Sequence, residues 1–150
     1  MYYAVECLAG DSSGNKLYVT DSYPNVTATT LQNNTFRNDQ LWLALYNPNN
    51  GGVSLKNKDS GNLIAVPSGN NPALLVPDTV ENESNLPDPS ALLNVANSDV
   101  ENYRVVRGLQ DQDNNLDLSG DPPYQDGVQV LFWTWSNDNN YKWRFLPIEV

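Results

Sequence analysis

The chain repeats one pattern three times, and this repeat constrains the fold more than any other feature of the sequence. In each copy a short apolar strand, a polar turn and a second short strand follow one another, and a later apolar strand closes the copy. The closing strands contain Trp42, Leu92 and Trp143, and aligning these residues gives offsets of 50 and 51 residues. Three copies of about fifty residues therefore account for the whole chain of 150 residues.

Short apolar or alternating stretches predict strands throughout, whereas no window keeps apolar residues at helical spacing through two turns. Clusters of Asn, Asp, Ser, Gly and Pro separate the stretches, as at residues 47–52 and 136–140. An all-β chain with three copies of four short strands has the pattern of a β-trefoil, a barrel of six strands capped by three hairpins. We therefore expect one pseudo-three-fold symmetric domain, residues 1–150, with repeats at about 1–50, 51–101 and 102–150.

Composition and missing motifs exclude several classes of function. Eight basic residues face eighteen acidic ones, and the net charge of −10 repels phosphate backbones, so no nucleic-acid partner is expected. No stretch is long and apolar enough for membrane insertion. The absence of histidine excludes Ser-His-Asp triads and histidine zinc sites, and no glycine-rich phosphate loop is present. We expect no catalytic residue, no cofactor and no metal.

The single cysteine, Cys7, excludes an intrachain disulfide, and we expect it to be a small buried apolar side chain. Residues 1–6 have neither the basic nor the apolar segment of a signal peptide. The expected location is therefore the cytoplasm, where thiols stay reduced.

The third repeat resembles ricin B-type lectins, and especially the disulfide-free trefoil lectins of fungal fruiting bodies. The repeat of that family has a Leu-Asp strand, a glycine-containing hairpin, a strand ending in Trp, and a closing Gln-x-Trp. Here the first motif is Leu116-Asp117-Leu118-Ser119-Gly120, the strand runs from Asp126 to Trp133, and the close is Asn140-Tyr141-Lys142-Trp143. The first repeat keeps Gln40-Leu41-Trp42.

The resemblance implies a sugar site in the third repeat. Asp117 would accept hydrogen bonds from two vicinal hydroxyl groups, Trp133 would stack under the sugar ring, and Asn140 would bond a hydroxyl that Asp117 also holds. Asp lies here in the middle of a strand, where it is disfavoured, which strengthens the functional interpretation. Three further residues of the surrounding loops complete the predicted site: Gly120, Tyr124 and Asn137.

The same resemblance implies the ligand and the number of sites. Galactose or N-acetylgalactosamine is the expected sugar, on glycans of glycoproteins or glycolipids. In this alignment Tyr18 and Ile64 stand at the Asp position in the first two repeats, and Leu92 replaces the closing Trp of the second. We therefore expect one main site per chain. A lectin of this kind can also form a homodimer.

A second class of function shares the same fold. Trefoils also act as protease inhibitors through exposed loops, and residues 20–34 or 70–89 are long enough for that role. Fold alone does not separate a lectin from an inhibitor. The combination of Asp117, Trp133 and Asn140 favours the lectin.

Overall fold

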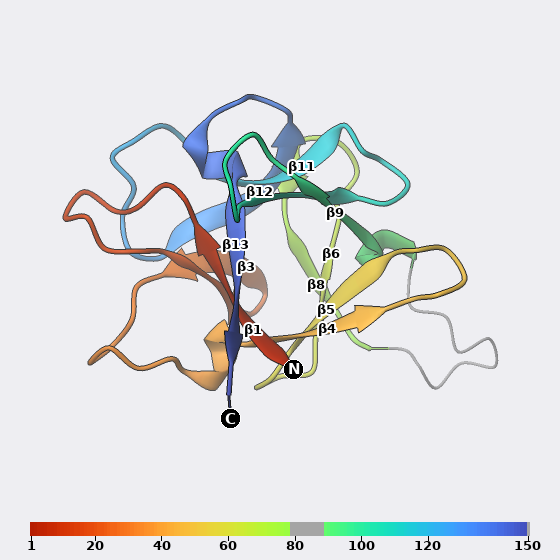
Figure 1. Ribbon diagram of the computed structural model, residues 1–150, viewed down its shortest axis with the longest axis horizontal. Coiled ribbons are helices and arrows are strands. Elements are labelled where there is room, and N and C mark those ends of the chain that lie inside the picture. The colour runs from red at the N-terminus through yellow and green to blue at the C-terminus, as the bar shows by residue number, and fades with distance from the viewer. Residues whose placement is uncertain (79–88, 150) are drawn as a thin grey trace.

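The structure is a computed structural model that describes residues 1–78 and 89–149. Its described part is built from strands and three short 3-10 turns, so the prediction of an all-β fold without longer helices is confirmed (Figure 1). The strands are β1 (Tyr2–Cys7), β2 (Tyr18–Ser22), β3 (Asn25–Thr29), β4 (Trp42–Tyr46), β5 (Val53–Asn57), β6 (Leu63–Ala65), β7 (Asn71–Pro72), β8 (Leu74–Val76), β9 (Leu93–Asn97), β10 (Arg104–Gly108), β11 (Asn114–Leu118), β12 (Val128–Thr134) and β13 (Trp143–Ile148). The 3-10 turns are η1 (Asn38–Gln40), η2 (Pro89–Ala91) and η3 (Asn139–Tyr141).

Strand pairing repeats with three-fold symmetry. The first residue of each closing strand pairs with the first strand of its own repeat and with the first strand of the repeat that follows. The pairs are Trp42 with Tyr3 and Asn57, Leu93 with Val53 and Gly108, and Trp143 with Arg104 and Cys7. The third repeat thus closes onto the first, and β1 and β13 pair along their whole length, which puts the two termini side by side (Figure 1).

One apolar cluster fills the centre of this arrangement. Trp42, Leu93 and Trp143 are all fully buried in it, together with Cys7, as expected for that thiol. Each tryptophan also satisfies its indole N–H, because Trp42 Nε1 donates to the Val19 carbonyl (2.9 Å) and Trp143 Nε1 donates to the Leu116 carbonyl (3.0 Å). The closing residues are therefore structural.

The structure corrects the alignment of the second repeat by one residue. Leu93, not Leu92, is the counterpart of Trp42 and Trp143, since Leu93 begins the strand that follows η2 and lies in the core. The two leucines are adjacent and equally apolar, so the sequence offers no mark that distinguishes them. A slip of one residue moves a side chain to the opposite face of a strand, and pairing alone settles the choice.

The counterparts of Asp117 are corrected as well. In the first strand pair of each repeat, Tyr18, Leu63 and Asn115 occupy one position, opposite Glu6, Lys56 and Arg107. Asp117 therefore corresponds to Thr20 and Ala65, and the predicted matches to Tyr18 and Ile64 are wrong. The connection before this strand is longer in the first repeat (8–17) than in the second (58–62) or third (109–113), which hid the register. Neither counterpart is a carboxylate, so the absence of this group from two repeats still holds.

The expectation of a long loop at residues 20–34 is also wrong, because β2 and β3 form a hairpin that occupies most of it. Alternate residues of β3, Val26 and Ala28, are buried in the core, as period-2 packing requires. Of the other loop, residues 70–89, the segment 79–88 lies outside the described residues. In the described part of the chain no helix is long and apolar enough to cross a membrane.

Candidate functional site

Asp117 lies in β11 between two residues of the core. Leu116 and Leu118 point into the apolar cluster, so the alternation of the strand turns Asp117 to the opposite face. The side chain is only 5% exposed. Asn140, in η3, donates from Nδ2 to Asp117 Oδ1 at 2.5 Å. This bond fixes the amide so that its oxygen remains an acceptor, and the Tyr141 hydroxyl and the Leu118 backbone N–H also interact with the Asp117 carboxyl.

Burial has a clear electrostatic effect on this carboxyl group. Loss of solvent raises the pKa of Asp117 from its ordinary value of 3.8 to about 7, against hydrogen bonds that lower it, the largest from Asn140. A buried acid of this kind is costly when ionised, which is why the site is a candidate for function rather than for stability.

Trp133 supplies an aromatic surface beside Asp117. It lies near the end of β12 and shares one face of that strand with Gln129 and Leu131, and all three line the same cleft as Asp117 and Asn140. The cleft has a volume of about 630 Å³ and we call it the Asp117 cleft. Trp133 is 40% exposed and lines the cleft, so part of the ring is accessible to a ligand.

The remaining predicted residues take different places. Gly120 lines the Asp117 cleft, at a positive φ of 82° that favours glycine. Tyr124 is buried and donates its hydroxyl to the Gly120 carbonyl (3.2 Å), so it supports the loop and lies outside this cleft. Asn137 also lies outside it and donates to the exposed carboxylate of Asp99 (3.2 Å).

Other residues of the cleft were missed by sequence reasoning. Asn70, Asn71 and Pro72 come from the second repeat, because β7 pairs with β12. Asn70 Oδ1 accepts a hydrogen bond from the backbone N–H of Thr134 (3.0 Å). Such a contact between repeats leaves no signal in the sequence. Asp138 and Tyr141, by contrast, flank Asn140 and could have been included from their position alone.

The second exposed tryptophan, Trp135, lies apart from Trp133. Strand alternation alone would place both side chains on one face, but β12 ends at Thr134 and Trp135 turns away to pack edge-on against Tyr141, with ring centroids 5.5 Å apart. It lines a different hollow, beside Arg107. Neither ring belongs to the core.

Comparisons place this geometry among known folds. No family model and no curated protein matches the sequence. The designed three-fold symmetric protein ThreeFoil matches with a TM-score of 0.74 at 15% identity, over 98% of this chain and 99% of its own. A ricin B-like lectin of Macrolepiota procera, solved with lactose, matches with a TM-score of 0.70 at 18% identity, over 97% and 94%. The fold is a β-trefoil.

A third trefoil agrees, the C-half of an earthworm R-type lectin solved with GalNAc. Its TM-score is 0.62 at 15% identity, over 97% of both chains. The predicted fold class is thus confirmed, and the resemblance to ricin B-like lectins holds for the fold.

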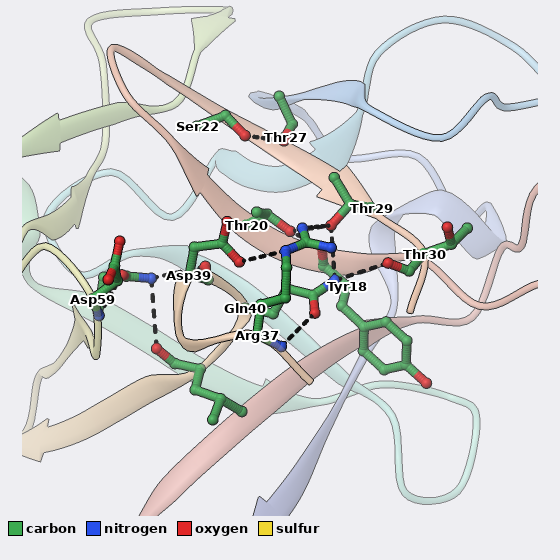
Figure 2. Close-up of polar contacts among 12 residues, drawn as sticks. Tyr18, Thr20, Ser22, Thr27, Thr29, Thr30, Arg37, Asp39, Gln40 and Asp59 are labelled. Atoms are coloured by element: carbon green, nitrogen blue, oxygen red, sulfur yellow. Dashed lines mark hydrogen bonds and ion pairs between the residues drawn. The ribbon is translucent and has the colours of Figure 1, made fainter. Parts of the chain in front are cut away.

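The first trefoil repeat fills its equivalent position with its own side chains (Figure 2). Thr20 stands for Asp117, Thr29 for Trp133 and Asp39 for Asn140. The two threonine hydroxyls lie 2.6 Å apart, and Gln40 Nε2 donates to Thr29 Oγ1 at 2.9 Å. Arg37 forms an ion pair with Asp39 (3.1 Å). These polar groups satisfy one another, whereas the third repeat has an exposed ring beside a buried carboxylate.

The second trefoil repeat has aliphatic side chains at two of the three positions. Ala65 stands for Asp117 and Val76 stands for Trp133. The third repeat therefore differs from the second, because it combines the carboxylate, the amide and the aromatic ring in one cleft.

Among the described residues, no group of three or more His, Cys, Asp or Glu side chains could hold a metal ion.

Proposed function

We propose that the protein is a non-catalytic lectin that binds galactose- or N-acetylgalactosamine-type glycans through one main site, the Asp117 cleft. The observation that carries this proposal is a buried carboxylate in mid-strand, bonded by Asn140 and facing the same cleft as the open ring of Trp133. The resemblance of the sequence to ricin B-type lectins supports it as well.

The arrangement suits the two surfaces of a neutral sugar. A sugar presents hydroxyl groups at its rim and C–H bonds on one face. Asp117 can accept two hydroxyl hydrogen bonds, Asn140 Oδ1 can accept another, and Trp133 can cover the apolar face. Such open, wet sites bind single sugars weakly, with a Kd of about 0.1–1 mM.

Two observations favour a galactose-type sugar. The axial 4-hydroxyl of galactose lets one carboxylate hold two neighbouring hydroxyls while the opposite face stays flat for stacking. Structures with this fold were solved with lactose, which ends in galactose, and with GalNAc. At 18% and 15% identity these likenesses support the sugar class as a proposal for this chain.

A glycan array followed by titration of two variant pairs tests the function. We expect the array to select glycans that end in galactose or N-acetylgalactosamine. Asp117→Ala should abolish detectable binding, because losing a charged acceptor for two hydroxyls costs roughly 2–4 kcal/mol. The control Asp113→Ala removes an exposed carboxylate of the preceding turn and should bind normally.

The second pair compares two tryptophans whose side chains are exposed to nearly the same extent. Trp133→Ala should lose binding, whereas Trp135→Ala, which lies outside the Asp117 cleft, should keep it. Normal binding by the Asp117→Ala protein would refute the site. No bound glycan on the array, together with inhibition of a protease, would favour the inhibitor alternative, and release of free sugar from the bound glycan would contradict a non-catalytic role.

A further inference from the structure

A second hollow adjoins the Asp117 cleft. It has a volume of about 590 Å³, and three of its lining residues, Asp121, Asp138 and Asn140, also line the cleft. Its far wall comes from residues 8–10, so the first repeat contributes to it across the junction with the third. A ligand bound at Asn140 therefore has a further space directly on the other side of that residue.

The surfaces of this second hollow resemble those of the cleft in kind. Ala9, Pro122 and the buried Tyr124 supply apolar surface. Asp121 and Asn139 also line it, and both residues are exposed. The side chain of neither residue forms a hydrogen bond or ion pair with another described residue. Apolar walls with solvent-exposed polar groups at the edge are the surfaces that a sugar ring can use.

The size of the two spaces exceeds the need of one sugar residue. Each volume, about 590 and 630 Å³, lies within the range of about 300–1,000 Å³ typical of pockets for whole small ligands. A ring seated between Asp117 and Trp133 would leave the second hollow empty.

The hollow is larger than its symmetry mate at the junction of the second and third repeats. Because Cys7 corresponds to Gly108, Ala9 and Gly10 correspond to Gln110 and Asp111. The described hollow beside Gln110 and Asp111 has a volume of about 240 Å³. Smaller side chains at residues 9 and 10 thus accompany a space more than twice as large, beside the proposed sugar site.

We propose that the second hollow is a subsite for the next residue of an oligosaccharide whose terminal sugar lies at Asp117. This inference rests on the proposed lectin function and makes the preferred ligand an oligosaccharide rather than a free sugar. Affinity is gained at the subsite through contacts of the second ring with Ala9, Pro122 and the free groups of Asp121 and Asn139.

The test compares single sugars with disaccharides by titration calorimetry. The probes are the methyl glycosides of galactose and N-acetylgalactosamine and a set of disaccharides ending in each, joined through β1-3, β1-4, α1-3 and α1-4 linkages. We expect the best disaccharide to bind at least tenfold more tightly than the methyl glycoside of its terminal sugar.

Two variants assign that gain to the second hollow. Ala9→Gln places the side chain of its symmetry mate in the hollow and should bring disaccharide affinity down to that of the single sugar, which itself stays unchanged. Asn139→Ala should remove part of the gain. The reciprocal control, Gln110→Ala, should alter neither affinity, and thermal melting confirms that each variant is folded.

The outcomes separate this inference from the proposed function. Equal affinity for single sugars and all disaccharides, or a full gain retained by folded Ala9→Gln and Asn139→Ala proteins, would overturn the subsite and leave the lectin intact. If the Asp117→Ala protein still bound both the single sugars and the disaccharides, the proposed function itself would be refuted.

Discussion

Asp117 combines a cost to folding with the binding role that we propose for it. Its neighbours Leu116 and Leu118 belong to the core, and its own burial raises its pKa to about 7. Sequence alone marked it as out of place, because Asp is rare in mid-strand. The bond from Asn140 and the depth of burial could not be predicted, since both depend on how η3 packs on β11.

The first prediction concerns binding against pH. The ionised carboxylate accepts charge-assisted hydrogen bonds on both oxygens, whereas the protonated acid accepts weaker ones, so binding should be strongest above the pKa of about 7 and weaken as pH falls through it. If the ionised form alone binds, affinity should drop about tenfold for each pH unit well below the pKa. Calorimetric titration of a galactoside at pH 8, 7, 6 and 5 measures this, and a constant affinity across the series would contradict it.

The second prediction concerns stability. Folded Asp117 keeps its proton up to a pH of about 7, whereas an unfolded chain releases it near 3.8, so this group makes stability fall as pH rises through that window. Asp117→Asn removes the buried charge and keeps the shape. It should raise the free energy of unfolding at pH 8 by about 1–3 kcal/mol, measured by urea denaturation, with no gain at pH 3. A lower free energy of unfolding for the Asp117→Asn protein at pH 8 would contradict a destabilising effect of the buried carboxylate.

At the scale of strands, the repeat predicted most of the architecture. Polar turns and apolar runs indicated four strands per repeat, and the three-fold spacing of the closing strands located the two tryptophans that lie in the core. The errors were errors of register: Leu92 for Leu93, and Tyr18 and Ile64 for Thr20 and Ala65. Turn lengths differ among the repeats, and register is fixed by cross-strand pairing, which spacing along the chain does not reveal.

The third prediction separates a closing strand from the cleft. Trp143→Ala removes a fully buried ring and its hydrogen bond to the Leu116 carbonyl, and should lower the free energy of unfolding by about 3–5 kcal/mol. Trp135→Ala truncates an exposed ring and should cost much less. Thermal and urea denaturation of both proteins test this, and similar losses in the two variants would contradict the assignment of Trp143 to the core.

At the scale of the whole molecule, symmetry of the fold contrasts with asymmetry of its polar groups. Three repeats share one pairing pattern, yet the first fills its position with the network around Thr29 and Arg37 (Figure 2). The second repeat has Ala65 and Val76 at the corresponding positions. We therefore propose one main site for each chain. Such a chain can crosslink cells only as a dimer or larger assembly, because crosslinking needs two sites.

The number of sugars bound per chain tests whether the third repeat provides the one main site. Calorimetric titration of the protein with a monovalent galactoside, such as methyl galactoside or N-acetylgalactosamine at millimolar concentration, should give close to one site per chain at pH 8. The Asp117→Ala protein should give no heat of binding under the same conditions. A stoichiometry close to three, or one site that survives in the Asp117→Ala protein, would contradict the assignment of sugar binding to the third repeat.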